Sequence, residues 1–277
     1  MAEITAALVR QLREETNLPM MDCKAALTEA GGDKETAKDL LRKKGLKIQE
    51  GRGGRETAFG RFGLYTGLDK KAGGIVELKC ESAPVAGSAE FIQLANDMAQ
   101  QLATGPVVKT GEELLDQPSP SKPGMTLRQV KDDMFNRIRE VFNVGRMARI
   151  DATTGGYSHN SGTVSGVLVE VEGGSDEAAK DVSMHIAAMR PLAVNTNEVD
   201  PAIVAKEREI LRDAALAEGK PASIVDKMVE GRLKNFYAER VLLEQPFVKE
   251  SSMSVGEYAK SKGMQVKKFV HWELGKG

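Results

Sequence analysis

The sequence has 277 residues, of which 41% are hydrophobic and 29% charged, and this balance excludes intrinsic disorder as the state of the whole chain. Its 39 basic and 40 acidic residues leave a net charge of −1, which excludes an overall positive field able to hold a nucleic acid. Because no stretch approaches the roughly 20 apolar residues that span a bilayer, and because the acidic N-terminal segment is unlike a signal or transit peptide, we expect a cytoplasmic protein without a membrane partner.

The first 46 residues predict a small module of three helices. Thr5 and Asp33 are placed to cap the first and third helices, and Pro19 can open the second. The third helix is expected to end before Gly45, because a run of cations precedes that glycine. A bundle of this size buries little surface, so we expect it to dock on a partner and not to catalyse a reaction.

Residues 47–60 include the run EGRGGRETAFG and predict a flexible linker. An RNA-binding role is a second interpretation of the same glycines and arginines. It is disfavoured because the segment is short and no array of aromatic side chains accompanies it.

After the linker, one pattern of strand and helix occurs twice. Residues 74–80 alternate apolar with charged side chains and precede an amphipathic helix over 89–102. Residues 166–172 repeat the alternation, and residues 176–189 repeat the helix. This duplication predicts an α+β fold with two related lobes, over 61–145 and 146–277.

Further helices are expected between and within the lobes. Three prolines interrupt the segment before residue 127, and residues 127–142 predict an amphipathic helix. Within the second lobe, Pro201 and Pro221 can each open a helix, so residues 200–238 predict an inserted antiparallel hairpin. The apolar segments 241–243 and 269–274 predict strands that complete this lobe.

No motif for covalent chemistry is visible, so we expect neither catalytic residues nor a metal site nor a cofactor. Cys23 and Cys80 lack the spacing of metal ligands, the three histidines are scattered, and no phosphate-binding loop, HExxH or GxSxG motif occurs. Asp22 opposes ionisation of the neighbouring Cys23, which predicts a packed thiol. An enzyme that uses Cys23 with a distant histidine is the alternative.

Four blocks of sequence together resemble the bacterial translation elongation factor Ts family, the nucleotide exchange factors of the GTPase EF-Tu. The blocks are Pro19-Met20-Met21-Asp22-Cys23-Lys24-Ala25-Ala26-Leu27 within segment 4–44, Met184-His185-Ile186-Ala187-Ala188, Met228-Val229-Glu230-Gly231-Arg232 and Gln245-Pro246-Phe247-Val248. The resemblance covers nearly the whole chain. It implies an N-terminal module similar to ubiquitin-associated domains, a two-lobed core and a helical arm.

The resemblance also implies the surfaces that meet EF-Tu. Met21 and Lys24 of the N-terminal module would contact its nucleotide-binding domain, whereas Gly166, His185 and Val248 would contact its third domain. Each position has a structural alternative. Met21 can fill the core of the module, His185 can belong to the core of the second lobe, and Gly166 can serve close strand packing.

The first lobe departs from the family pattern after its strand. Family members follow the cysteine of this strand with Thr-Asp-Phe-Val-Ala, whose acid and ring push beside the magnesium site of the GTPase. Here Ser82, Ala83, Pro84 and Val85 occupy the corresponding loop. We expect these four residues to bind EF-Tu and to act as a backbone wedge in nucleotide exchange. The alternative is a protein that binds and stabilises EF-Tu with weak or no exchange activity.

Overall fold

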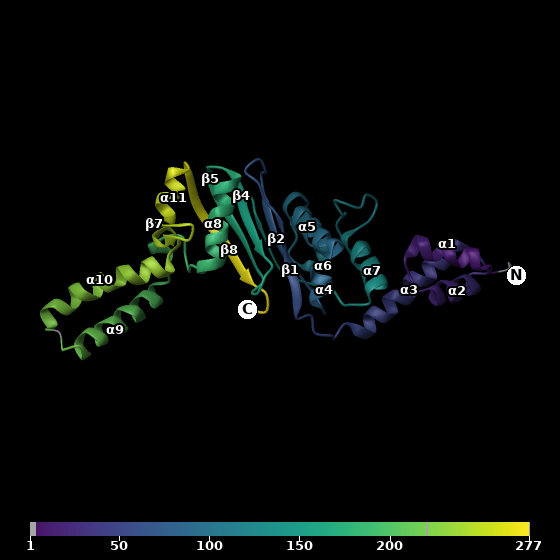
Figure 1. Ribbon diagram of the computed structural model, residues 1–277, viewed down its shortest axis with the longest axis horizontal. Helices are drawn as coiled ribbons and strands as arrows, with labels where there is room; N and C mark the ends of the chain where they lie inside the picture. Colours follow the sequence, from purple (N-terminus) through teal and green to yellow (C-terminus); the bar gives the residue numbers. More distant parts are fainter. Residues whose placement is uncertain (1–3, 220, 277) are drawn as a thin grey trace. The chain divides into compact units, whose positions relative to one another are not determined.

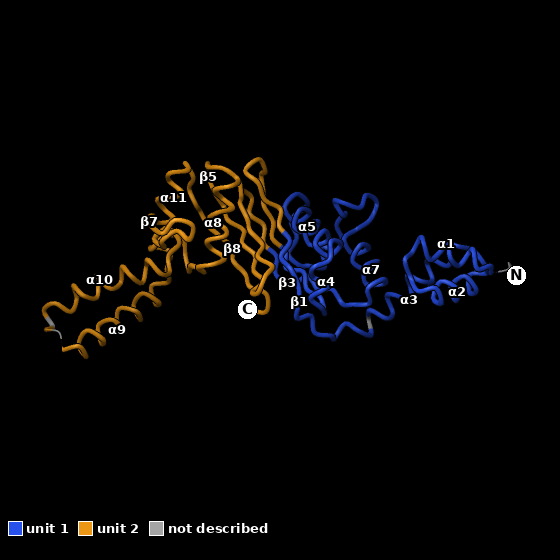
Figure 2. Tube along the Cα trace, in the orientation of Figure 1, with its two compact units in different colours: residues 1–63, 76–147 blue, residues 64–75, 148–277 orange. Residues whose placement is uncertain are grey.

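The computed structural model describes residues 4–219 and 221–276, and the chain divides into two compact units (Figures 1 and 2). Unit 1 comprises Met1–Gly63 and Val76–Met147, and unit 2 comprises Leu64–Ile75 and Ala148–Gly277. Helices alternate with short sheets in both, which confirms the predicted α+β class.

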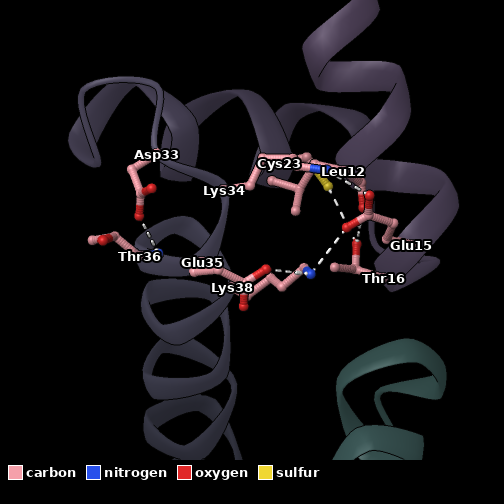
Figure 3. A network of polar contacts seen from close by, with 9 residues as sticks. All are labelled: Leu12, Glu15, Thr16, Cys23, Asp33, Lys34, Glu35, Thr36 and Lys38. Atoms are coloured by element: carbon pink, nitrogen blue, oxygen red, sulfur yellow. Dashed lines mark hydrogen bonds and ion pairs between the residues drawn. The ribbon is translucent and has the colours of Figure 1, made fainter.

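The N-terminal module contains α1 (Ala6–Thr16), α2 (Met20–Glu29) and α3 (Lys34–Arg52). Both predicted caps are confirmed. The Thr5 hydroxyl accepts a hydrogen bond from the N–H of Leu8. Figure 3 shows the second cap, in which the Asp33 carboxylate accepts a bond from the N–H of Thr36 at 2.7 Å. The buried core of the module consists of Val9, Leu12, Leu18, Cys23, Ala26, Leu27, Ala37 and Leu41.

The third helix does not end before Gly45, and that prediction was wrong. It continues to Arg52, so the first residues of the predicted linker are helical. Gly45 faces α7 (Leu127–Ile138), and a Cβ at this glycine would lie 1.6 Å from Asn136 Oδ1. The glycine therefore allows two helices to approach closely within unit 1, and it does not terminate one.

The first sheet has the strand order β1 (Phe59–Tyr65), β2 (Gly73–Cys80) and β3 (Asn143–Ile150). Strand β2 matches the predicted alternating segment, but β1 and β3 were not predicted. The helices of unit 1 that follow β2 are α4 (Ala83–Ala86), α5 (Ala89–Thr104), α6 (Gly111–Leu115) and α7. Helix α7 ends four residues earlier than expected, because Arg139 adopts a left-handed conformation at φ 64°.

The second sheet is antiparallel and has the order β4 (Thr154–His159), β5 (Ser165–Gly173) and β8 (Met264–Glu273). Helix α8 (Asp176–Met189) packs on it and buries Val182 and Ile186 against Val167 and Val169 (Figure 1). The remaining elements of this core are β6 (Pro246–Phe247), β7 (Glu250–Ser254), α11 (Val255–Ser261) and the 3-10 turns η1 (Thr196–Glu198) and η2 (Leu242–Glu244).

The segment 241–243 was predicted as a strand and is not one. Its residues form η2 after a single bridge between Val241 and Ala193. All three side chains are apolar, and short apolar runs do not distinguish a strand from a buried turn. The C-terminal strand was predicted correctly, although β8 begins five residues earlier than expected.

The two repeated segments occupy equivalent places. Strand β2 is central in the first sheet and β5 is central in the second. The long helix of each repeat is capped by a serine hydroxyl, from Ser88 for α5 and from Ser175 for α8. These correspondences support the internal repeat that the sequence predicts.

The predicted hairpin is formed by α9 (Pro201–Ala217) and α10 (Ala222–Arg240), which lie antiparallel in unit 2 (Figure 1). Ala215, Val225 and Val229 form its small core, and Arg208 pairs with Glu230 at 3.1 Å across the two helices. Neither these nor the other helices of the described ranges are long and apolar enough to cross a membrane.

Candidate protein-binding surfaces

The first candidate surface lies between α1 and α2. Met21 exposes 72% of its surface and Met20 exposes 45%, although both are long apolar side chains in a small module. Together with Lys24 they line a groove whose opposite wall contains Ile4 and Val9. The alternative in which Met21 fills the core is therefore wrong, and an exposed thioether beside a lysine suits a protein partner.

Asp22 and Cys23, which lie between Met21 and Lys24 in the sequence, have structural roles. Cys23 is fully buried, and its Sγ lies 3.8 Å from the Leu18 carbonyl and 3.7 Å from the Thr16 hydroxyl. Asp22 pairs with Lys44 at 2.8 Å and with Arg139 at 3.3 Å. The predicted packed thiol is confirmed, and burial denies a substrate access to Cys23.

The second candidate surface is the tip, which we define as Ser82, Ala83, Pro84 and Val85. Its residues form the start of α4 and not an open loop, because Ser82 is extended and Pro84 fits the first turn of a helix. Ala83 and Pro84 are exposed, whereas Val85 is half-buried. Ser88 fixes the far end of the turn, since its hydroxyl donates to the Val85 carbonyl at 2.8 Å.

Two carboxylates hold the near end of the tip. The Glu140 carboxylate accepts bonds from the Ser82 hydroxyl at 2.6 Å and from the Ser82 N–H at 3.1 Å. The Glu81 carboxylate accepts a bond from the Val141 N–H at 2.8 Å and pairs with Arg55 at 3.0 Å. The Val141 bond, followed by the Arg55 contact, lowers the pKa of Glu81 below its ordinary value, so this carboxylate stays ionised at neutral pH.

Cys80 precedes the tip and is fully buried. Burial raises the pKa of its thiol to about 11, and the thiol donates to the Ser82 carbonyl at 3.2 Å. A thiol with this pKa stays protonated at neutral pH and is a poor nucleophile. Cys80 therefore contributes packing and a hydrogen bond to the base of the tip.

The third candidate surface brings two of the resembling sequence blocks together. His185 on α8 is fully buried, and its Nε2 lies 2.9 Å from Gln245 Oε1. Its Nδ1 accepts a bond from the Val248 N–H at 3.1 Å, which places the ring proton on Nε2. Burial lowers the pKa of His185 and the Gln245 contact offsets part of that effect, so the ring is neutral at pH 7.

His185 has no exposed surface with which to touch a partner, and the exposed residue of this cluster is Val248, at 51%. The neighbours of Val248 are fixed on both sides. The Phe247 ring stacks on the Tyr258 ring with centroids 4.1 Å apart, and Lys249 pairs with Asp181. The backbone thus presents Val248 at a defined place on the surface.

A groove beside Val248 is lined by Tyr157, His159, Met184, Ala187 and Ala188, among others. Met184, Ala187 and Ala188 come from α8 next to His185, and of these Ala188 is exposed whereas the other two are partly buried. Gly166 does not line this groove: it is buried in the central strand β5, where it pairs with Ser158 and Trp272. Any effect of Gly166 on binding would therefore pass through the sheet.

Sequence reasoning missed two residues that organise these surfaces. Gln245 is fully buried, and its amide also donates to the Glu239 carbonyl at 2.8 Å. Arg139 contacts Asp22 from the end of α7. Gln245 belongs to a resembling block and could have been recognised as a polar residue in an apolar context, but no sequence signal marks Arg139. Among the described residues, no group of three or more His, Cys, Asp or Glu side chains is placed to hold a metal ion.

Comparison with known proteins gives a consistent result. The family model described as Elongation factor TS matches residues 81–276. The elongation factor Ts of Methylococcus capsulatus is 44% identical over 275 residues, covering 99% of this chain and 93% of its own length. That of Bordetella petrii is 41% identical and covers 100% and 93%, and that of Aquifex aeolicus is 40% identical and covers 96% of each chain. With its fold, its exposed surfaces and these matches taken together, the chain belongs to the elongation factor Ts family.

Proposed function

We propose that this protein is a guanine-nucleotide exchange factor for the translation GTPase EF-Tu and promotes GDP release during polypeptide elongation. Membership of the family supports this proposal. The exposed apolar side chains Met21 and Val248, far apart in sequence, are suited to a partner that is gripped at more than one place. In this proposal Met21 and Lys24 meet the nucleotide-binding domain of EF-Tu, and Val248 meets its third domain.

Exchange of this kind requires no covalent chemistry. A factor that binds the nucleotide-free GTPase more tightly than the GDP-bound form must weaken GDP binding by the same factor. A preference of about 1.4 kcal/mol corresponds to tenfold weaker GDP binding. The proposed work of this chain is therefore differential binding, and incoming GTP releases the factor by the same linkage.

The observation that carries the proposal is the anchored tip. A wedge must resist being pushed back when it displaces part of its partner. Ser82 donates two hydrogen bonds to the Glu140 carboxylate, and the tip follows directly from the buried strand β2. Ala83 and Pro84 remain exposed in front of these anchors, so their backbone can press on the phosphate and magnesium region of EF-Tu.

Stopped-flow fluorescence tests the proposal. EF-Tu from the same organism is loaded with fluorescent GDP and mixed with unlabelled GDP and increasing amounts of this protein. We expect the release rate to rise and then saturate. If gel filtration shows a complex with nucleotide-free EF-Tu but release is not accelerated, the exchange function is refuted. Failure to form that complex refutes the choice of partner.

One observation favours a second candidate function. Neither Ala83 nor Pro84 carries a charge or an aromatic ring, so this tip lacks the chemistry with which the family pattern acts beside magnesium. The alternative is a protein that binds and stabilises EF-Tu with weak exchange activity. In that case complex formation would raise the thermal stability of EF-Tu while the GDP release rate stayed near its spontaneous value.

A further inference from the structure

Residues 139–141 lie between α7 and β3. They contact residues that support two of the candidate surfaces, the α1–α2 groove and the tip. On one side, Arg139 Nη2 donates to Asp22 Oδ2 at 3.3 Å. Asp22 lies on α2 between Met21 and the buried Cys23, so this bond reaches the helix that carries Met21 and Lys24. The carbonyl of Arg139 also accepts a bond from Arg52 at the end of α3.

On the other side, the next two residues hold the tip. The Glu140 carboxylate accepts hydrogen bonds from the Ser82 hydroxyl at 2.6 Å and from the Ser82 N–H at 3.1 Å. The N–H of Val141 donates to Glu81 at 2.8 Å. Three consecutive residues therefore connect the base of the tip with α2, the helix that supplies Met20, Met21 and Lys24 to the α1–α2 groove.

The segment that follows α3 also makes polar contacts with the base of the tip and with β3. Arg55 pairs with Glu81 at 3.0 Å, and the Asn143 amide donates to the Thr57 hydroxyl at 3.2 Å. Residues in the range predicted as a flexible linker thus make specific contacts with the tip base and with the start of β3. These contacts hold residues 55–57, in the segment that joins α3 to β1, against the base of the tip and β3.

The conformation of Arg139 indicates that its side chain is used. The residue caps α7 at φ 64° and ψ 25°, in the left-handed region where glycine is favoured. A side chain in this region costs about 1 kcal/mol. The contact with Asp22 gives this arginine a role that glycine could not fill, and the Arg139 side chain is only 26% exposed.

We propose that residues 139–141 form a positioning junction, which holds the α1–α2 groove and the tip in one fixed arrangement so that both engage EF-Tu together. Arg139 and Glu140 are positioning residues, because neither is part of the exposed contact surfaces. The inference rests on the proposed exchange function for its consequence, but the junction itself is a property of the free protein.

Spin-label distances test the junction without any partner. Labels are attached at Glu29→Cys on α2 and Thr104→Cys at the end of α5, both exposed positions, while the native cysteines are buried. We expect one narrow distance population in the free protein and a clearly broadened one in Arg139→Gly. Glycine suits the left-handed conformation, so this variant removes the side chain without disturbing the cap. Arg137→Gln is the matched control, because it also removes one positive charge near the end of α7. Arg137 pairs with Glu90 and not with Asp22, so this variant should keep the narrow distribution.

GDP release kinetics test the consequence. Arg139→Gly should raise the half-saturating concentration about five- to tenfold with the maximal rate unchanged, because α2 loses a contact that orients it and must then be oriented during binding. Glu140→Ala should instead lower the maximal rate, because it releases Ser82 and the tip. Asp22→Asn combined with Arg139→Gly should be no worse than Arg139→Gly alone.

The outcomes separate the two ideas. A narrow distance distribution in Arg139→Gly overturns the junction, whatever the kinetics. If the unmodified protein does not accelerate GDP release, the exchange function fails, whereas the spin-label distances still decide whether the junction exists. A broadened distribution in Arg137→Gln as well would also overturn the assignment to Arg139.

Discussion

The Nδ1 atom of His185 accepts a hydrogen bond from the backbone N–H of Val248 at 3.1 Å, so a fully buried side chain holds an exposed one in place. The two residues are 63 positions apart and belong to two different resembling blocks. Their pairing explains how a histidine without exposed surface can matter for a binding surface. It acts on the shape of the segment that carries Val248.

Replacement of His185 should therefore weaken both the fold and the complex. His185→Ala leaves the Val248 N–H and Gln245 Oε1 without their partner in a buried site, which should cost about 2–4 kcal/mol of unfolding free energy. The displaced Val248 should raise the Kd for nucleotide-free EF-Tu about tenfold, at a temperature where the variant is folded. Urea unfolding and titration calorimetry measure the two effects.

Val248→Ala is the matched variant at the exposed end of this pair. Because Val248 is half exposed, its loss should change the unfolding free energy by less than about 0.5 kcal/mol while weakening the complex. Unchanged affinity in both variants would remove this segment from the interface.

The stability of unit 2 should decrease in mild acid through His185. Burial lowers the pKa of this histidine below its ordinary value of 6.5, so the unfolded chain takes up a proton at a higher pH than the folded chain. The contribution of neutral His185 to the free energy of unfolding is therefore complete above about pH 6.5. It is lost as the pH falls through the lower pKa of the folded protein. Urea unfolding from about pH 8 to pH 5 should show a steeper loss for the unmodified protein than for His185→Asn. His271, whose pKa burial also lowers, titrates in both proteins, so parallel curves would contradict the assignment.

The sequence predicted the elements with strong local signals. Thr5 and Asp33 cap helices as predicted, and β2 and β5 follow the alternation of apolar and charged residues. These features depend on residues within a few positions of one another. The period of a helix or strand and the chemistry of a cap are readable without knowledge of the tertiary fold.

Features that depend on distant neighbours could not be predicted in this way. Gly45 resembles a helix stop until Asn136 is seen beside it, and Arg139 is an ordinary surface arginine until Asp22 is placed in reach. The role of His185 is similar: the resemblance marked it as part of the binding site, but only the packed structure shows that it is buried behind Val248. In each case a tertiary contact decides between two uses of the same residue.

Substitutions in the tip can distinguish an exchange factor from a protein that binds EF-Tu with weak exchange activity. Ala83→Asp with Pro84→Phe restores an acid and a ring at exposed positions, in front of the anchored Ser82. If the unmodified tip already acts through its backbone, the maximal GDP release rate should change by less than about threefold, or under 1 kcal/mol. A rise of about a hundredfold at similar affinity would instead favour the protein that binds with weak exchange activity. Stopped-flow release with fluorescent GDP distinguishes the two, and Ala83→Ser is the control for a change of side chain without charge.

The close approach of α3 and α7 should make Gly45 intolerant of any side chain. A Cβ at this position would lie 1.6 Å from Asn136 Oδ1, and Asn136 is buried, so the amide has little room to move. We expect Gly45→Ala to destabilise unit 1 by about 1–3 kcal/mol, although alanine normally stabilises a helix. Gly51→Ala, on the same helix with no atom within 4 Å of its added Cβ, should be neutral or stabilise by up to about 1 kcal/mol.

Combining Gly45→Ala with Asn136→Ala should recover part of the loss, because the smaller residue on α7 leaves space for the new methyl group. Urea unfolding of the four proteins provides the measurement, and a Gly45→Ala variant as stable as Gly51→Ala would show that the two helices are not held together at this point.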